Sequence, residues 1–334
     1  MKKYLIYILL LLIFSSCFKE EDKWNVSDSN SSFSTLGSDY SNQVFYNLSS
    51  QSIVSENKWT IWDLAFYAQE NDYYIKLNDA ANMKVFKAEG LSFENTNAID
   101  NNWDSKVDYA NGDRTKIALN YSKNSESSDT IYYNEDTYII KLGIDGLGQD
   151  MGIRKFQLLY TYQKFYVFRY SNLDGSELIT SMVEKDQTLN YTYFSFSDGG
   201  KEVIVEPDKS TWDLLFSRTT DMAISNDLSD TIFDYSVVSV LLNSFSAKSY
   251  RENEISYEDQ KIQNIDNTLF SSTPNTIGYY WKYYNLEESQ YSIIENQHYL
   301  VKDFNNYYYK FKILSFYDPE TNNKGTIGFE YQLL

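Results

Sequence analysis

The 334-residue chain has very few of the residues from which many active sites are built. Cys17 is the only cysteine and His298 the only histidine, beside 3 prolines and 13 glycines. One cysteine cannot form an internal disulfide, and ordinary zinc sites need several Cys or His ligands. A catalytic triad could use only His298 as its base, and neither a Gly-x-Ser-x-Gly nor a Walker A sequence occurs. We therefore expect a protein that is not an enzyme. Only paired carboxylates for glycoside hydrolysis stay open, because their spacing in space is not visible in a sequence.

The chain also begins without an apolar run long enough to cross a bilayer. The run that ends at Phe14 has eleven residues, whereas a spanning helix needs about 20. It follows two lysines and precedes Ser15-Ser16-Cys17, which is the order of a secretory signal. Small residues before a lone cysteine resemble the lipobox of bacterial lipoproteins, although Phe14 replaces the usual Leu. We expect residues 1–16 to be a signal peptide and Cys17 to carry lipid. An ordinary signal peptide with an incidental cysteine is the alternative.

Positive charge is scarce, since 29 Lys and Arg face 47 Asp and Glu and leave a net charge of −18. Such a surface repels nucleic acid and anionic headgroups. We expect no nucleic-acid partner, and membrane association through the lipid anchor only. After the cysteine, Lys19-Glu20-Glu21-Asp22 looks like the export signal of surface lipoproteins in the Bacteroidota. It predicts anchoring in the outer membrane, facing the cell exterior; a solvated acidic linker is the alternative.

Aromatic residues are abundant, with 32 Tyr and 20 Phe. Aromatic and β-branched residues favour strands, and the short apolar runs of this chain are bounded by Asp, Asn, Gly and Ser. Helical periodicity is weak except from Ser256 to Leu269, where Ile262, Ile265 and Leu269 fall three and four residues apart behind a candidate cap, Ser256. The sequence predicts a mostly β fold with a few short helices.

The chain also carries an internal duplication. The segment from Asn42, NQVFYNLSSQSIVSENKWTIWDLAF, and the segment from Asn190, NYTYFSFSDGGKEVIVEPDKSTWDLLF, both run through two turns to Trp-Asp-Leu-x-Phe. The distance from Asn to Trp is 20 residues in the first copy and 22 in the second. Further parallels follow in the same order: Leu77-Asn78 with Leu242-Asn243, Tyr138–Lys141 with Tyr299–Lys302, Lys155–Leu159 with Lys310–Leu314, and Phe165–Tyr170 with Thr326–Tyr331. Such agreement predicts two tandem halves.

We expect four parts in the chain. Residues 1–16 are the signal peptide, residues 17–34 the lipidated cysteine and a flexible linker, residues 35–186 the first half and residues 187–334 the second. The length after cleavage suits two domains. Each half is predicted to be an antiparallel β-sandwich-like domain.

The repeated blocks resemble the HmuY-like haem-binding lipoproteins of the Bacteroidota. The resemblance rests on the Trp-Asp-Leu-x-Phe strand, the later Leu-Asn and the C-terminal text YYKFKILSFYDPETNNKGTIGFEYQLL, and it is stronger in the second half. It implies a β-rich fold that holds haem at one end, takes it from the surroundings or from host haemoproteins, and passes it to an outer-membrane receptor. The matching residues are expected to cap turns and fill the core rather than to touch haem: Trp62, Asp63, Phe66, Trp212, Asp213, Phe216, Lys310, Phe311 and Tyr331.

Candidate ligands for haem iron are few. Family members that bind haem hold the iron with two His or with Met, whereas this chain has His298 alone. Met and Tyr are also known haem ligands. The candidates are His298 and Met151, both at ends of predicted strands, and Met222, after the second Trp strand. The alternatives are core packing for each Met and an exposed strand end for His298. We expect no metal site besides haem iron.

Three functions follow from these features. The first is a surface lipoprotein that binds haem or a related ligand for uptake, which predicts an apolar slot with a Met, His or Tyr aimed into it. The second is a glycan- or protein-binding surface lipoprotein, which predicts exposed coplanar aromatic rings. The third is a structural accessory that has lost ligand binding, which predicts neither feature.

Overall fold

The computed structural model describes residues 29–69, 72–127, 129–225 and 231–334. The predicted signal peptide, Cys17 and the acidic segment at 19–22 lie outside the described residues. Within the described ranges the chain is mostly β, and its helices are short 3-10 segments. The predicted fold class is confirmed. No helix of this part of the chain is long and apolar enough to span a membrane.

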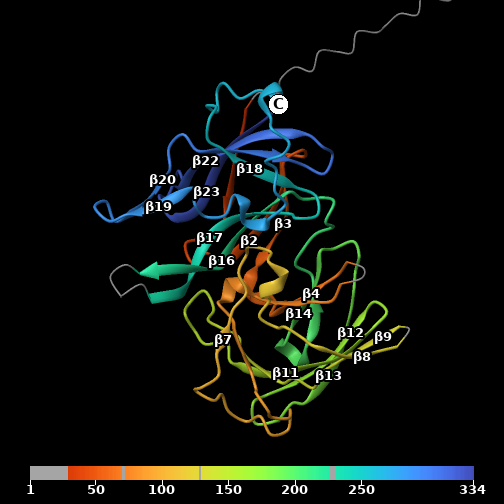
Figure 1. Ribbon diagram of the computed structural model, residues 1–334. Coiled ribbons are helices and arrows are strands. Elements are labelled where there is room, and N and C mark those ends of the chain that lie inside the picture. The colour runs from red at the N-terminus through yellow and green to blue at the C-terminus, as the bar shows by residue number, and fades with distance from the viewer. Residues whose placement is uncertain (1–28, 70–71, 128, 226–230) are drawn as a thin grey trace, which may run out of the picture.

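The larger sheets lie at opposite ends of the molecule in Figure 1. One has five strands in the order β1-β23-β22-β21-β18, with β1 at Asn30–Thr35, β18 at Lys248–Glu252, β21 at His298–Lys302, β22 at Tyr308–Tyr317 and β23 at Lys324–Leu333. The other has eight strands, β13-β12-β11-β10-β6-β7 with β9 on β11 and β8 on β9. Its strands are β6 (Lys84–Lys87), β7 (Ser105–Lys106), β8 (Lys123–Glu126), β9 (Thr130–Tyr133), β10 (Tyr138–Lys141), β11 (Ile153–Tyr162), β12 (Phe165–Ser171) and β13 (Ile179–Glu184).

Two four-stranded sheets lie between them (Figure 1). The order β17-β16-β2-β3 comprises β2 (Asn42–Asn47), β3 (Ser52–Lys58), β16 (Leu214–Ser225) and β17 (Thr231–Leu242). The order β15-β14-β4-β5 comprises β4 (Leu64–Tyr67), β5 (Ile75–Leu77), β14 (Tyr191–Ser195) and β15 (Lys201–Val203). A separate hairpin joins β19 (Lys282–Asn285) to β20 (Gln290–Ile293), and the 3-10 segments are η1 (Trp59–Ile61), η2 (Asp79–Ala81), η3 (Arg114–Lys116), η4 (Ser197–Gly199), η5 (Ile262–Asn264) and η6 (Pro274–Thr276).

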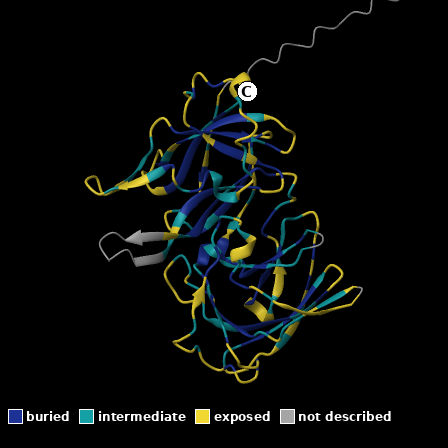
Figure 2. Ribbon diagram, viewed as in Figure 1, coloured by how far each residue is buried: buried dark blue, intermediate teal, exposed yellow. Residues whose placement is uncertain are grey.

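Each four-stranded sheet packs on one larger sheet and forms a sandwich with it. In the first sandwich the ring of Phe66 stacks on Phe168, with 5.1 Å between the centroids. In the second, Phe216 stacks on Phe329 at the same distance. Figure 2 shows buried residues along these strands and exposed ones at the loops and hairpin ends. Alternate residues of each strand face one core, as the two-residue period of a strand requires.

The two halves exchange strands. β2 of the first copy pairs with β16 of the second, and β14 of the second pairs with β4 of the first. β1 likewise pairs with β23 along its whole length. Backbone hydrogen bonds therefore cross the predicted division at residues 186 and 187 in both directions, and the division itself stays a prediction.

The exchange is reciprocal in its details. The backbone N–H of Asp63 donates to the carbonyl of Phe194 over 2.8 Å, and that of Asp213 donates to Tyr46 over 2.9 Å. Each copy contacts the other through equivalent positions. This reciprocal arrangement is the one that an approximate twofold axis between the two copies would produce. The structure thus agrees with the duplication that the sequence predicts.

The predicted linker is too long at its C-terminal end. It was predicted to extend to residue 34, whereas β1 begins at Asn30. Ser34 is fully buried and Phe33 is half-exposed. The alternation of buried and exposed side chains extends over only six residues, so the sequence of β1 could not be distinguished from that of a polar linker.

The helix predicted from Ser256 to Leu269 does not form. Ser256 accepts the N–H of Asp259 as expected of a cap, but only the three-residue η5 follows. Ile262 and Leu269 are about half exposed. A helix of this length draws most of its stability from packing of its apolar face, and this face has no core to pack on.

Candidate functional site

The only histidine is buried rather than exposed. His298 opens β21 with 2% of its surface exposed, and its ring meets that of Tyr257 edge-on with 5.6 Å between centroids. Its Nε2 atom has no hydrogen-bond partner among the described residues. Burial lowers the pKa of His298, which favours the neutral ring. The expectation of an exposed strand end was wrong.

The structure does not bring the predicted haem ligands together. Met151 packs against the core of the first sandwich, whereas His298 opens β21 in the five-stranded sheet of the second. Met222 is half-exposed on β16. None of these three residues lines the cavity described next, and their role as iron ligands stays a prediction.

A cavity of about 500 Å³ lies between the two four-stranded sheets, where the two copies meet. Its aromatic lining residues are Phe45, Trp62, Tyr67, Tyr74, Tyr191, Tyr193, Trp212 and Phe245. Its charged and amide-bearing lining residues are Gln43, Gln69, Lys76, Asp79, Asn111, Arg114, Asn190 and Glu206, and Ser217 and Thr219 add hydroxyl groups. The outward faces of the strands form this lining, while their inward faces fill the sandwich cores.

One wall of the cavity is a cluster of tyrosines under a guanidinium group. The rings of Tyr67 and Tyr74 stack with 4.3 Å between centroids. The guanidinium of Arg114 lies 4.6 Å from the centre of the Tyr67 ring and donates to the Tyr67 hydroxyl over 2.9 Å. It also donates to Asp72 over 2.7 Å, which fixes its direction. The hydroxyls of Tyr74 and Tyr191 bond to each other over 3.1 Å.

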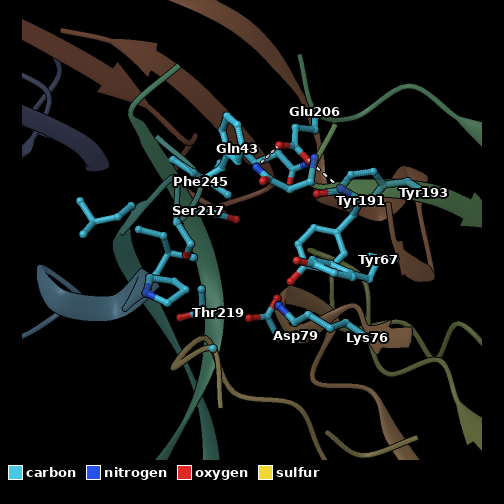
Figure 3. Close-up of a pocket in the computed structure, with 18 of the residues that line it drawn as sticks. Gln43, Tyr67, Lys76, Asp79, Tyr191, Tyr193, Glu206, Ser217, Thr219 and Phe245 are labelled. Carbon is cyan, nitrogen blue, oxygen red and sulfur yellow. Dashed lines mark hydrogen bonds between the residues drawn. The ribbon is translucent and has the colours of Figure 1, made fainter. Parts of the chain in front are cut away.

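The opposite wall mixes hydroxyl, aliphatic and aromatic side chains. Figure 3 shows Tyr67 and Tyr191 on one side of the cavity, facing Ser217 and Thr219 on the other. Asp79, the first residue of η2, lies between the two walls (Figure 3). Burial raises the pKa of Asp79, while the charge of Lys76 acts in the opposite direction.

Glu206 lies beside the cavity as a buried carboxyl group. One of its oxygens accepts the backbone N–H groups of Asn190 and Tyr191, each over 3.2 Å, and the other accepts the side-chain amide of Asn190 (Figure 3). No Lys or Arg pairs with it among the ion pairs of the described residues. Burial raises the pKa of Glu206 to about 7, against the opposing effect of these hydrogen bonds.

The cavity lies where equivalent positions of the two copies meet. Phe45 and Tyr193 hold equivalent positions, and their rings meet Trp212 and Trp62 edge-on, with 4.9 and 5.0 Å between centroids. Tyr67, however, corresponds to Ser217, five residues after each Trp. The two copies thus give the cavity two different walls, one with the tyrosine cluster and Arg114 and one with Ser217 and Thr219, which suits a ligand without twofold symmetry.

Sequence reasoning missed Tyr67, Tyr74, Arg114 and Glu206. Tyr67 could have been found from the strand period, because Leu64 and Phe66 face the core and the next residue must face away. Tyr74 and Arg114 come from a loop and a 3-10 segment. No short-range sequence pattern predicts that Tyr74 and Arg114 lie beside Tyr67 of β4 in the same cavity wall.

Comparison with known proteins gives a family match over the second half. Residues 187–331 match the family described as HmuY protein. A search of curated proteins gave no match. The predicted resemblance to HmuY is therefore confirmed, on the second copy.

Several solved structures are also similar to this chain. Apo PinO from Porphyromonas gingivitis is 8% identical, with 92% of this chain and 98% of that chain covered and a TM-score of 0.27. The apo HmuY analog TFO from Tannerella forsythia is 10% identical, with the same coverages and a TM-score of 0.26. An HmuY-like heme-binding protein from Bacteroides vulgatus is 9% identical, covering 35% of this chain and 90% of its own, with a TM-score of 0.18.

Proposed function

We propose, taking as premise that residues 187–331 belong to the HmuY family, that this chain binds haem or a related planar ligand in the cavity between its two copies. The observation that carries the proposal is a ligand-sized cavity lined by aromatic rings and two cationic side chains, in a chain of this family. Ligand pockets of about 300–1,000 Å³ take small organic molecules, and this cavity of about 500 Å³ falls in that range.

The lining suits a flat macrocycle that carries two carboxylates. Aromatic rings offer apolar faces to such a ring system. Lys76 and Arg114 can meet its carboxylates, since charge-assisted hydrogen bonds to carboxylate are among the stronger polar contacts. Of the residue types that hold haem iron in other proteins, this lining contains tyrosine alone. His298, Met151 and Met222 lie elsewhere, so iron binding in this cavity would not use them.

A glycan is the second candidate ligand. The stacked rings of Tyr67 and Tyr74 offer a flat apolar face. Acid, amide and hydroxyl groups such as Asp79, Gln43 and Ser217 surround it and could bond to sugar hydroxyls. A glycan needs no iron ligand, and this difference separates the two candidates in an experiment.

The test is a titration of residues 18–334 with haemin, followed by the Soret band, with protoporphyrin without iron and a panel of oligosaccharides alongside. We expect a saturable, shifted Soret band. A Ser244→Trp variant places a large ring at an exposed part of the cavity lining. It should weaken haemin binding by about tenfold or more, which corresponds to about 1.4 kcal/mol.

Thr180→Trp serves as the matched control, because Thr180 is equally exposed but lies on β13, outside the cavity. It should bind haemin like the unchanged protein. A featureless haemin titration, or equal binding by both Trp variants, would count against haem in this cavity. Saturable binding of an oligosaccharide that Ser244→Trp alone weakens would favour the second candidate.

We further propose that the chain is a lipoprotein of the outer membrane that presents this cavity to the cell exterior and hands its ligand to a receptor. The support is the signal sequence, the lone Cys17 and the acidic segment after it. A Cys17→Ala variant should leave the membrane fraction. If this variant stayed in the membrane fraction, the lipid anchoring would be contradicted. If protease added to whole cells did not cleave the unchanged protein, its orientation toward the cell exterior would be contradicted.

A further inference from the structure

We propose that Tyr67 is the axial ligand of the iron, as a phenolate that Arg114 stabilises at the cavity wall. This inference rests on the proposed function, because it requires haem in the cavity. It names a residue that the sequence patterns did not suggest and excludes the single histidine.

The first support is the contact between Tyr67 and Arg114. A phenol binds ferric iron after loss of its proton, so a ligand tyrosine needs a neighbour that stabilises the negative oxygen. The Nη2 atom of Arg114 donates to the Tyr67 hydroxyl over 2.9 Å. A hydrogen bond from a cation favours the charged form of its acceptor. The Asp72 carboxylate holds Arg114 from behind, over 2.7 Å, so that the guanidinium keeps its direction.

The second support is the state of the other tyrosines of the same lining. The hydroxyls of Tyr74 and Tyr191 bond to each other. Among the tyrosines that line the cavity, Tyr67 is the one whose oxygen accepts a hydrogen bond from a cationic side chain in the described contacts.

The third support is position. Tyr67 is the last residue of β4, so its backbone is fixed by pairing with Tyr191 of β14. The Tyr74 ring stacks on it, and the Arg114 guanidinium lies beside both rings, 4.6 Å from the Tyr67 centroid and 5.1 Å from the Tyr74 centroid. Figure 3 shows it facing the open part of the cavity. A ligand group whose backbone and ring are positioned by its neighbours needs little reorganisation when its partner binds.

The binding step is balanced without an oxidant or a reductant. The O–H bond of Tyr67 breaks and its proton goes to water. An Fe–O bond forms between the phenolate and ferric iron and replaces a bound water. No electron is transferred. Because an anionic oxygen favours the higher charge of ferric iron, reduction to the ferrous state should weaken this bond.

The experiment compares haemin complexes of residues 18–334 by visible absorption, electron paramagnetic resonance and resonance Raman spectroscopy. The unchanged protein should give a high-spin ferric signal, a phenolate-to-iron charge-transfer band and tyrosinate vibrations. Tyr67→Phe should lose the band and the vibrations, whereas the control Tyr162→Phe, at an exposed position of β11 outside the cavity, should keep them. Arg114→Ala should shift the charge-transfer band, because it removes the hydrogen bond to the Tyr67 oxygen.

Tyr67→His gives a readout that unfolding cannot imitate. If Tyr67 faces the iron, the new imidazole should convert the spectrum to that of a histidine-ligated haem, while His298→Ala in the unchanged background should alter nothing. A haemin complex whose spectrum is the same in Tyr67→Phe and Tyr67→His would overturn the inference and leave haem binding standing. No haemin complex in the unchanged protein would instead overturn the proposed function.

Discussion

Glu206 and Glu56 hold equivalent positions in the two copies, yet only one of them is buried. Each accepts a hydrogen bond from the side-chain amide of the asparagine that opens its copy, Asn190 for Glu206 and Asn42 for Glu56. Glu206 is 3% exposed beside the cavity, whereas Glu56 is exposed on β3. The duplicated pair therefore separates the effect of burial from the effect of the hydrogen bond.

We predict that the stability of the protein falls as the pH rises from about 4.5 to about 7, and that Glu206 contributes to this fall. Its pKa is about 7 in the folded chain against 4.5 for an unperturbed group, so the folded state binds the proton more tightly than the unfolded state. Stability is then highest below the lower value and declines until the folded group has ionised. The full effect is on the order of 3 kcal/mol for such a difference in pKa.

Urea unfolding of Glu206→Gln at several pH values checks this prediction. The variant should show a smaller decline between pH 5 and pH 7 than the unchanged protein. The decline should not vanish, because burial also raises the pKa of Asp213 to about 7. Glu56→Gln, the matched control, should keep the original slope. Equal slopes in both variants would show that Glu206 ionises normally.

Single residues were predictable where their role is to fill a core. Trp62 and Trp212 are 6% and 5% exposed and pack in a small third core, as expected of core positions, although both also line the cavity. The carboxylates of Asp63 and Asp213 accept backbone N–H groups, those of Phe196 and Leu48, so the expected turn-capping role is confirmed. The cavity residues were not predictable, because polar side chains on the outer face of a strand look the same whether they face solvent or another copy.

At the scale of elements, β1 shows how far a short strand can support a sheet. Its six residues pair in register with β23, from Asn30 opposite Tyr331 to Thr35 opposite Thr326. Without it, β23 would become an edge strand with unpaired backbone groups. Exposed edges of this kind promote association between chains.

We predict that a chain beginning at residue 36 is less stable than one beginning at residue 30 by a few kcal/mol, since each lost hydrogen bond contributes about 0.5–1.5 kcal/mol. The shorter chain should also associate at lower concentration. Urea unfolding and light scattering measure the two effects. A chain beginning at residue 30 is the control and should match one beginning at residue 18. If all three chains unfolded at the same urea concentration, β1 would not contribute to the fold.

The elements themselves were largely predictable, but their partners were not. The strands β4, β10, β11, β16, β21 and β22 fall on the blocks that repeat in the sequence. β2 and β14 are copies of one strand, so the local sequence of each is compatible with pairing to either β4 or β16. Which copy a strand joins depends on chain connections and on the contacts between the sheets, and neither is encoded in a short segment.

At the scale of the whole molecule, the exchanged strands make each sandwich depend on both halves. The first core contains Phe194 of β14, and the second contains Val44 and Tyr46 of β2. The cavity takes its walls from both copies for the same reason. Residues 18–186 or 187–334 alone would leave a sandwich without two strands of one sheet.

We therefore predict that the two fragments, divided between residues 186 and 187, fold only together. The cut falls in an exposed connection between β13 and β14, so it removes no strand. Coexpressed fragments should copurify through a tag on one of them and give the circular dichroism spectrum of the intact chain. Tyr46→Asp in the first fragment puts a charge in the core of the second sandwich and should abolish copurification, whereas Ile53→Asp, on the exposed face of β3, should not. If each fragment alone were soluble and monomeric and unfolded cooperatively, each half would complete its own sheets. The cavity would then not be formed by strands of both copies.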